Sequence, residues 1–268
     1  MSEPTSKGHL NPGDAGVSFD RFELGPGLGE LVRHVWVVRW SLPVGETRPQ
    51  RVLSYPALNV VVQAHGAVLA GPDPRVSVTE LQGSGWGVGV LFRPAAGPLL
   101  ATEPPRELVG RVVPFRGAPS GRITALLERG GSRHELIAAL RSWLVPLGAA
   151  VDESGVLVNR IAHAAESEPD LVRAADLAER TGMGLRTLER LTREFIGVTP
   201  KWLIECRRLQ EAATRLHAHP STALSPLAAE LGYADYAHFA RRYSAIVGES
   251  PRATVLSAER RADAATEG

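Results

Sequence analysis

The sequence of 268 residues contains one cysteine, Cys206, and no long run of apolar residues. A single cysteine excludes an intramolecular disulfide framework and a cysteine-based structural zinc site, and it fits a reducing compartment. No segment approaches the ~18–20 uncharged apolar residues that a membrane-spanning helix needs. The N-terminal residues also lack the apolar core of a signal peptide. We therefore expect a cytoplasmic protein that has no membrane partner.

The chain also lacks an excess of charge of either sign. Its 30 Lys and Arg residues are opposed by 29 Asp and Glu residues, which leaves a formal net charge of +1. Residues 1–153 carry 15 basic and 14 acidic side chains, and residues 154–256 carry 13 and 12. Proteins that bind nucleic acid usually have a basic excess. Net charge therefore argues against DNA as a partner, unless arginines are concentrated where DNA would lie.

Patterns that belong to metal sites and to catalysis are missing as well. The N-terminal half has His34, His65 and His134, without a His-x-His pair or a His/Glu spacing typical of a metal site. Alternating glycines in residues 83–89 lack the Lys-Ser/Thr that completes a phosphate-binding loop. Such glycines admit close packing or leave space for a pocket. We expect no catalytic residue, no metal and no cofactor, and hence no enzyme.

Glycine and proline divide the chain into two unlike parts. Residues 1–122 hold 17 of the 27 Gly and 14 of the 20 Pro. Short apolar runs bounded by these residues predict antiparallel strands at residues 32–40, 58–64, 67–70, 76–79 and 85–92. Residues 156–256 instead predict consecutive helices. The expected fold class is a two-domain α+β protein, with a β-rich barrel or cupin-like domain and flanking helices, followed by an all-α domain.

The helical half contains a helix-turn-helix pattern. Ala174, Leu177 and Ala178 recur at i, i+3 and i+4 on a first helix that ends at Gly182. Residues 184–197 predict a second helix with a glycine cap, apolar positions at i, i+3 and i+7, and a left-handed glycine at its end. In a DNA-binding helix-turn-helix the N-terminal part of the second helix enters the major groove.

A long helix and a second pattern of the same kind follow. Residues 199–217 begin with a Thr-Pro pair, a strong signal for a helix start. A further short helix ends at Gly232, and Asp235 caps a helix that ends at Gly248. The connecting helix of ~18 residues spans ~27 Å at 1.5 Å per residue. This length is near the ~34 Å between successive major grooves on one face of DNA.

These two units resemble the C-terminal DNA-binding domain of the AraC/XylS family of transcription regulators over residues 172–254. The resemblance lies in LAERTGMGLRTLERLTREFIGVTPKWLIECRRLQEA and in LAAELGYADYAHFARRYSAIVGESP. The second segment matches the family signature at Gly232, Tyr233, Asp235, Phe239, Arg241, Tyr243, Gly248 and Pro251. Two positions depart from the pattern, since an aromatic residue is usual where Thr192 stands and a serine where Gly184 stands.

The resemblance implies two sets of DNA contacts. The base-contacting positions correspond to Arg186, Glu189, Arg190, Tyr236, Ala237 and Arg241. Phosphate contacts are expected from Thr187, Arg193, Arg207, Arg208, His238 and Arg242. Arginine can bind guanine O6 and N7 bidentately, and glutamate can accept a hydrogen bond from cytosine N4. Phosphate contacts position a protein on DNA without reading its sequence.

Each of these residues also has a plainer interpretation. An arginine on a helix surface is usually a solvated charge or the partner of an ion pair. Glu189 has Arg186 and Arg193 at helical spacing and can pair with either. For His238 the plainer interpretation, an ordinary surface histidine, is favoured over a base contact.

The N-terminal half resembles an uncharacterised β-rich domain found in such regulators, through VRHVWVVRW, RVLSYPALNVVV and GVGVLFRP. Its candidates for an effector pocket are the aromatic residues Trp36, Trp40, Tyr55, Trp86 and Phe92. An aromatic-lined barrel suits an apolar or planar effector, although the same rings would also suit a packed core. The apolar stripe of residues 133–144 is compatible with packing on its own domain or on a second subunit.

The resemblance therefore predicts a sequence-specific regulator organised in five segments. These are a flexible arm (1–18), a β-rich effector or dimerisation domain (19–148), a linker (149–155), the DNA-binding domain (156–256) and a flexible tail (257–268). Its expected partners are double-stranded promoter DNA, a small-molecule effector, a second copy of the chain and, for an activator, RNA polymerase. Two alternatives stay open for the N-terminal domain, namely a small-molecule-modifying cupin-like enzyme and an interaction module without a ligand.

Overall fold

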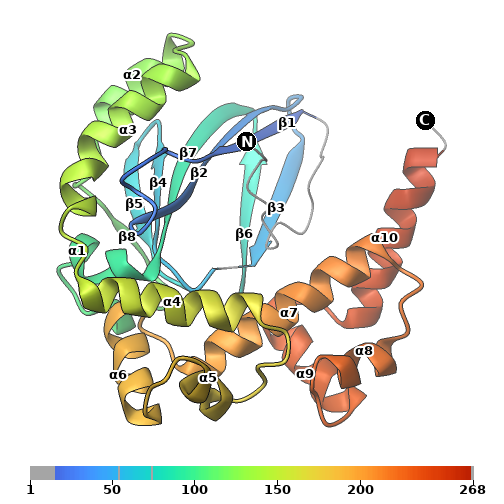
Figure 1. The fold of residues 1–268 in the computed structure, drawn as a ribbon. Coiled ribbons are helices and arrows are strands. Elements are labelled where there is room, and N and C mark those ends of the chain that lie inside the picture. The colour runs from blue at the N-terminus through green and yellow to red at the C-terminus, as the bar shows by residue number, and fades with distance from the viewer. Residues whose placement is uncertain (1–15, 54, 74, 267–268) are drawn as a thin grey trace.

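The structure is a computed structural model that describes residues 16–53, 55–73 and 75–266 (Figure 1). The arm expected over residues 1–18 lies almost wholly outside these ranges. Its last residues, Val17 and Ser18, begin the first strand.

The N-terminal part is built on an antiparallel sheet of six strands in the order β1-β2-β7-β4-β5-β8. These strands are β1 (Val17–Phe22), β2 (Val32–Ser41), β4 (Asn59–Gln63), β5 (Gly66–Ala70), β7 (Ser84–Phe92) and β8 (Val112–Pro114). Two further strands, β3 (Thr47–Leu53) and β6 (Val76–Gln82), pair with each other and form a separate ribbon, the β3–β6 ribbon. The edge strands β1 and β8 do not pair with each other, so the sheet is open. The β-rich domain is confirmed, and the expected barrel is corrected to an open sheet.

One face of the sheet carries the core of the N-terminal part. Val35, Val37 and Val90 are buried there in one cluster with residues of α2 (Ser120–Glu128) and α3 (Arg133–Gly148), the two helices that lie beside the sheet in Figure 1. Leu136, Leu140 and Leu144 of α3 belong to the same cluster. The apolar stripe of α3 therefore packs on its own domain.

The opposite face carries two indoles that lie over glycines. Trp36 pairs with Gly89 and Trp40 with Gly85 on the neighbouring strand β7. A β-carbon at either glycine would overlap the facing indole ring. The alternating glycines of this strand thus serve close packing, one of the two roles that the sequence suggests.

Three short helical segments lead from β7 toward the helical part. They are η1 (Pro94–Ala96), α1 (Gly97–Leu100) and η2 (Pro105–Glu107). The helical part itself consists of α4 (Glu153–Ser167), α5 (Ala174–Arg180), α6 (Leu185–Phe195), α7 (Pro200–Ala218), α8 (Leu224–Glu230), α9 (Tyr236–Val247) and α10 (Pro251–Thr266). Within the described ranges, every helix is too short or too polar to cross a membrane.

Two boundaries differ from the sequence expectation. Helix α4 begins at Glu153, inside the linker expected over residues 149–155. Helix α10 continues through residues 257–266, where the sequence predicts a flexible tail. The tail is helical because α10 packs against α7 and because Ala258 is buried, at 7% exposure.

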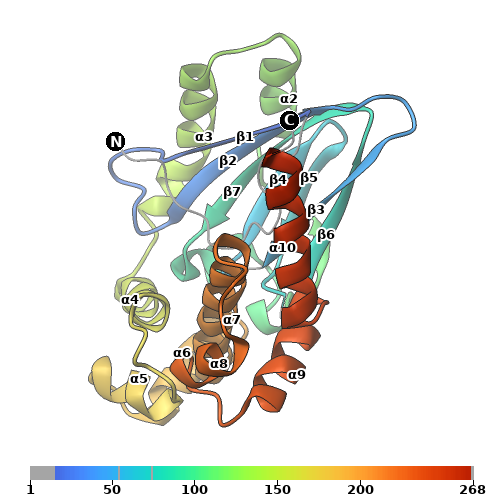
Figure 2. The ribbon, with the colours of Figure 1, turned by 90° about the vertical axis from the view of Figure 1, so that its right-hand side faces the viewer.

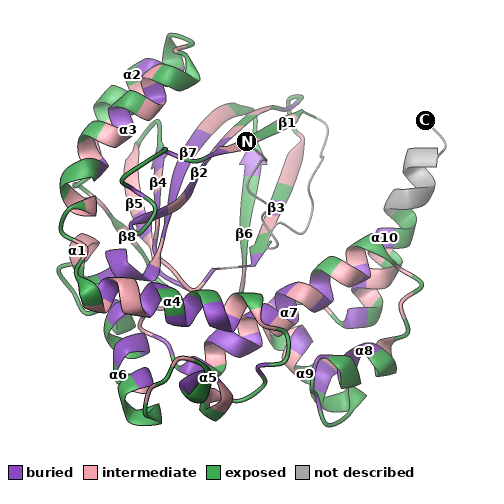
Figure 3. Ribbon diagram, in the orientation of Figure 1, coloured by how far each residue is buried: buried purple, intermediate pink, exposed green. Residues whose placement is uncertain are grey.

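Two apolar clusters stabilise the helical part, and Figure 3 shows their buried stripes along the helices. One cluster joins α4 to α6 through residues such as Ile161 and Leu188. The other joins α7, α8 and α9 through residues such as Leu209 and Phe239. Leu53 of the β3–β6 ribbon belongs to this second cluster. The N-terminal part therefore contributes to the core of the helical part.

Candidate nucleic-acid interface

Local signals position the first helix-turn-helix, α5 and α6. Gly182 turns the chain at φ +67°, and Gly184 caps α6 with extended backbone. Leu188 and Leu191 are buried toward the other helices. Gly197 follows the end of α6 at φ +87°, the left-handed conformation that glycine adopts without strain. The sequence expectations for this unit are confirmed at each of these positions.

Four expected DNA contacts on α6 are exposed, and one is half-buried. Arg186, Thr187, Arg190 and Arg193 are exposed, and Glu189 is intermediate. Arg190 pairs with Glu194 one turn further along at 2.7 Å between Nη1 and Oε2. Both side chains of this pair are more than half exposed, so the pair is weak and easily exchanged for a DNA contact.

Thr192 replaces the usual aromatic residue on the inner side of α6. Its side chain is fully buried, at 0% exposure. Its hydroxyl donates to the Leu188 carbonyl at 3.0 Å, which satisfies the polar atom inside the helix. The departure from the family pattern is accommodated without an unpaired buried hydroxyl.

The second unit, α8 and α9, is capped by a carboxylate. The Asp235 side chain accepts from the backbone N–H of His238 at 2.6 Å, which satisfies one of the free donors at the start of α9. Phe239 and Tyr243 are buried on its inner side, with ring centroids 5.5 Å apart. The outer side exposes four residues expected at DNA: Tyr236, Ala237, His238 and Arg241.

Three arginines expected at phosphates make contacts inside the protein. Arg207 is buried, and its Nη2 donates to the Leu171 carbonyl at 2.9 Å. Burial also lowers the pKa of the Arg207 guanidinium. The Arg207 side chain therefore joins α7 to the segment before α5 and is directed into the protein. The guanidinium of Arg208 lies 3.8 Å from the centroid of the Tyr233 ring, and Arg208 is half-buried.

Arg242 is the third of these arginines. Its Nε donates to Oε1 of Glu205 on α7 at 2.5 Å, and the Arg242 side chain remains 43% exposed. The hydrogen bond to Glu205 raises the pKa of the Arg242 guanidinium. Arg242 therefore braces α9 against α7 and leaves part of its guanidinium open to solvent.

Both reading helices lie on the side of the molecule away from the sheet, as Figures 1 and 2 show. Their C-terminal ends contact the N-terminal part: the Phe195 carbonyl of α6 lies against Gly97, and the Val247 carbonyl of α9 accepts from Arg51. Their N-terminal ends therefore point away from the sheet. Free N–H groups and the helix dipole make such ends favourable for anions such as DNA phosphates.

The structure does not assemble the aromatic pocket that the sequence suggests. Trp36 and Trp40 lie on one face of the sheet, where Trp36 stacks on Phe19. Phe92 lies on the other face, in the core beneath α3, and Trp86 packs against that core. Strand alternation separates these residues, because neighbouring positions in a strand point to opposite faces.

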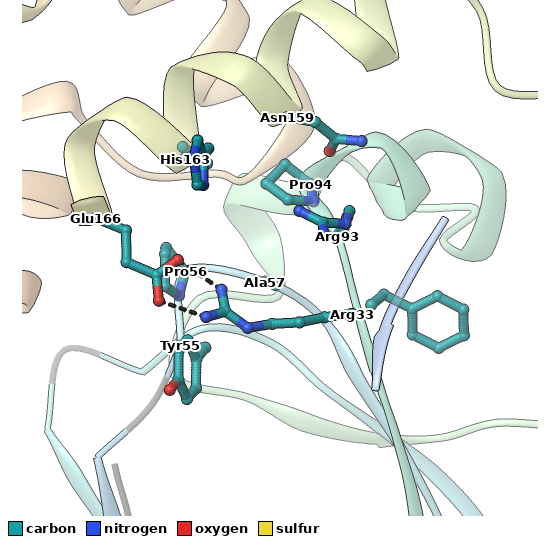
Figure 4. A pocket seen from close by; sticks show the side chains of 11 residues that line it. Arg33, Tyr55, Pro56, Ala57, Arg93, Pro94, Asn159, His163 and Glu166 are labelled. Atoms are coloured by element: carbon teal, nitrogen blue, oxygen red, sulfur yellow. Dashed lines mark hydrogen bonds and ion pairs between the residues drawn. The ribbon is translucent and has the colours of Figure 1, made fainter. Parts of the chain in front are cut away.

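A small pocket does lie where the sheet meets α4 (Figure 4). Tyr55 and Phe92 line it together with residues from both parts of the chain. Arg33 of β2 and Glu166 of α4 form a bidentate ion pair there, and the Arg33 guanidinium lies 4.5 Å from the Tyr55 ring centroid. Sequence reasoning missed this pair because its members are 133 positions apart and only the tertiary fold brings them together.

Other groups fix the same junction. Asn159 of α4 accepts from the Ala95 N–H at 3.0 Å and donates to the Glu30 carbonyl at 2.7 Å. Arg93 also lines the pocket, and within the described residues its buried Nε has no hydrogen-bond partner. The pocket thus contains one paired guanidinium and a second one with an unused donor.

The described histidines of the N-terminal part do not form a metal-binding cluster. His34 is buried, at 3% exposure, and burial together with the nearby Arg33 lowers its pKa to about 4. Throughout the part of the chain that the structure describes, no group of three or more His, Cys, Asp or Glu residues could hold a metal ion.

Comparisons with known proteins match the two parts of the chain separately. A model of a helix-turn-helix domain matches residues 177–256. A model of a domain of unknown function, DUF6597, matches residues 21–114. No curated protein matches the chain significantly.

Solved structures of ToxT from Vibrio cholerae align with most of the chain at low sequence identity. One, from strain O395, has 12% sequence identity and a TM-score of 0.43, covering 91% of this chain and 98% of that chain. Another, of ToxT bound to an unsaturated fatty acid, has 11% identity and a TM-score of 0.39, covering 92% and 97%. At this level of similarity, neither residue roles nor a ligand can be transferred from ToxT to this protein.

The family match falls on the two units whose caps, turns and exposed second helices have been described. It covers both reading helices and the long helix between them. The C-terminal part is therefore a helix-turn-helix domain of the AraC type, and the chain is a DNA-binding regulator that joins this domain to an N-terminal β-rich domain of the DUF6597 kind.

Proposed function

We propose that the N-terminal halves of α6 and α9 read two successive major-groove segments of one DNA site. The observation that carries this proposal is the shared direction of the two helices, since both turn their C-terminal ends to the N-terminal part of the chain and their N-terminal ends away from it. The proposed base contacts are Arg186, Glu189, Arg190, Tyr236, Ala237 and Arg241. Helix α7, with 19 residues, spans ~28 Å between the two units, which is compatible with adjacent grooves.

The proposed phosphate contacts are fewer than the sequence suggests. Thr187, Arg193 and His238 are exposed beside the base-reading positions, and the exposed part of Arg242 lies next to Arg241 on α9. Arg208 contributes at most through the exposed part of its side chain, and Arg207 does not contribute. Phosphate contacts of this kind set the position of the protein on DNA and leave the choice of sequence to the base contacts.

Selection of binding sites from random DNA, followed by fluorescence anisotropy, tests this assignment. Arg190→Ala and Arg241→Ala are each expected to weaken binding by about 1–3 kcal/mol and to relax the preference at one position of the site. Arg122→Ala, an exposed arginine of α2 on the far side of the sheet, is the matched control. Unchanged sequence preference in the Arg190/Arg241 double variant would reject the reading helices.

We further propose that the N-terminal domain binds a small-molecule effector in the pocket between the sheet and α4. The paired Arg33 and the unused donor of Arg93 favour an effector with an acidic group. Such a group would compete with Glu166 for Arg33 and would loosen the contact between α4 and the sheet. In this proposal the N-terminal domain is a sensor rather than an enzyme.

Thermal unfolding with benzoate and hexanoate, and with the corresponding amides, tests the effector proposal. The acids are expected to change the melting temperature and the amides are not. Arg33→Met should abolish the change, whereas Arg39→Met, at an exposed position of the same strand, should retain it. A response that survives in Arg33→Met would place the ligand elsewhere.

Two further partners are proposed on the family resemblance alone. These are a second copy of the chain and, for an activator, RNA polymerase. Sedimentation velocity with and without the selected DNA site tests the first, and transcription in vitro from a promoter carrying that site tests the second. A monomer on DNA, or transcription that does not respond to the protein, would reject the corresponding partner.

A further inference from the structure

We propose that the N-terminal domain holds the C-terminal ends of both reading helices and thereby sets the spacing between the two DNA segments that they read. In this proposal Arg51 is a positioning residue for α9. The inference rests on the proposed reading helices, but it concerns their separation rather than their base contacts.

The first contact is made by Arg51 of the β3–β6 ribbon at the end of α9. Its Nη2 donates to the Val247 carbonyl at 2.8 Å, and its Nη1 lies 3.2 Å from Oε1 of Glu249. Val247 is the last residue of α9, and Gly248 follows it in the left-handed conformation. Carbonyls at a helix end lack partners within the helix, and a cation is favourable there. Arg51 thus caps the second reading helix from another domain.

A chain of hydrogen bonds continues this contact into the core of the second unit. Oε1 of Glu249 accepts from the Thr254 hydroxyl at 2.9 Å, and the hydroxyls of Thr254 and Tyr243 lie 3.0 Å apart. Tyr243 is fully buried on the inner side of α9. The side chains of Arg51 and Glu249 are only 24% and 21% exposed, so solvent screens their pair less than a surface pair. A displacement of Arg51 would therefore affect α9 along its length.

Apolar packing reinforces the same contact. Leu53, at 2% exposure, lies in the cluster that contains Phe239 and Val247, and Val76 packs against that cluster. Both residues stand at the end of the ribbon that contains Arg51. The ribbon therefore completes the core of the second helix-turn-helix unit, and α9 has to follow the ribbon when it moves.

The second contact holds the end of α6. A β-carbon at Gly97 would overlap the Phe195 carbonyl at the end of α6, and a β-carbon at Gly197 would overlap the Pro105 carbonyl. These backbone segments approach each other as closely as glycine permits. The segment of residues 94–107, which directly follows β7, thus fixes the first reading helix.

One strand connects the two contacts. Strand β6 of the ribbon leads into β7 through Gly83 alone, and β7 leads into residues 94–107. The angle between the ribbon and the sheet therefore sets the separation of the two contacts. Trp40 stabilises this angle, because its indole N–H donates to the Gln82 carbonyl at 3.0 Å beside the turn.

A series of DNA sites tests the proposal. The two half-sites found by selection are separated by the selected spacer and by spacers one and two base pairs shorter and longer, and the affinity for each is measured by anisotropy. The wild-type chain is expected to prefer one spacer. Arg51→Met should reduce that preference by about fivefold or more while the base preference within each half-site stays the same.

Two further variants complete the experiment. Arg48→Met removes an arginine from the same strand whose partner is the neighbouring Glu46, and it should keep the wild-type spacing profile. Trp40→Phe removes the indole N–H at the turn and retains an aromatic ring, and it should broaden the profile as Arg51→Met does. Circular dichroism establishes that each variant is folded before binding is measured.

The outcomes separate this proposal from the assignment of the reading helices. A wild-type spacing profile in both Arg51→Met and Trp40→Phe would overturn the positioning role and leave the base contacts intact. Equal broadening in Arg48→Met would overturn it as well. Loss of base preference without a change of spacing in Arg51→Met would also contradict it, because a positioning residue acts on the separation of the helices.

Discussion

Arg242 of the second reading helix and Glu205 of the connecting helix form a bidentate ion pair. Glu205 is buried, at 8% exposure, although it lies on a helix that is flanked by two DNA-binding units. A carboxylate in that position is tolerable only because the guanidinium satisfies both of its oxygens. The pair thus links the second reading helix α9 directly to the connecting helix α7.

Removing this carboxylate should therefore destabilise the protein. Glu205→Gln is expected to lower the free energy of unfolding by about 1–3 kcal/mol, because it removes a charge-assisted bond from a buried site. Urea unfolding monitored by circular dichroism measures the change. Glu194→Gln is the control, since its pair with Arg190 is exposed and should contribute less than about 0.5 kcal/mol. Equal effects of the two substitutions would contradict this account.

Arg193, which is exposed, and Arg207, which is buried, should contribute differently to the salt dependence of DNA binding. Arg193→Met is expected to reduce the slope of log K against log salt by about 1, because it removes one phosphate contact. Arg207→Met should leave the slope unchanged and should lower the free energy of unfolding by about 1–3 kcal/mol, because the Leu171 carbonyl loses its donor.

Anisotropy titrations over a range of salt concentrations, together with urea unfolding, measure both quantities. A reduced slope in Arg207→Met would show that this arginine reaches DNA. A total slope that implies ten or more released counterions per protomer would also contradict the small set of phosphate contacts proposed.

His34 should make stability depend on pH. Its pKa is lowered to about 4 in the folded protein from an ordinary value near 6.5, mainly by burial. Between these values the unfolded chain binds more protons than the folded one, so stability is full above about pH 6.5 and falls as the pH drops toward 4. The loss over this window is on the order of 3 kcal/mol.

Urea unfolding at pH values from 7 to 4 measures this dependence. His34→Gln should make the decline shallower, because it removes the group that gains a proton on unfolding. His134→Gln, at an exposed position on α3, measures the effect of removing a histidine as such. An equally steep decline in His34→Gln and in the wild-type chain would exclude His34 as the source.

Gly197 should be sensitive to substitution. Gly197→Ala is expected to lower the free energy of unfolding by about 2–3 kcal/mol, because alanine is strained at φ +87° and its β-carbon would overlap the Pro105 carbonyl. Gly121→Ala, in the first turn of α2 with open space around it, should instead be neutral or stabilising by up to about 1 kcal/mol. Thermal and urea unfolding compare the two, and a tolerated Gly197→Ala would contradict the close approach of α6 to residues 105–107.

Part of the fold could be predicted because its signals are local. Thr199 and Asp235 cap α7 and α9 as their positions in the sequence indicate, and Gly197 and Gly248 adopt the left-handed conformation expected after a helix. Capping depends on a few neighbouring residues, which a single sequence displays directly. Strand β3 could not be predicted in this way, because its sequence TRPQRVL combines a proline with two arginines and lacks a regular apolar alternation.

The role of each arginine could not be predicted in the same way. Arg193 and Arg207 both stand on helices next to reading positions, yet one is exposed and the other is buried against a carbonyl 36 positions away. Composition alone suggests a pocket of five aromatic residues, whereas strand register places four of them, Trp36, Trp40, Trp86 and Phe92, on different faces of the sheet. Burial and register depend on contacts between distant segments, which composition does not specify.

The sequence by itself determined that the chain carries two helix-turn-helix units joined by a long helix, because caps, turns and apolar periodicity are properties of short segments. Only the tertiary structure decided how these units are held. Arg51 reaches Val247 across 196 positions, and Arg33 reaches Glu166 across 133. Such pairs form only when whole domains pack against each other. Their contribution to stability therefore cannot be predicted from any short segment of the sequence.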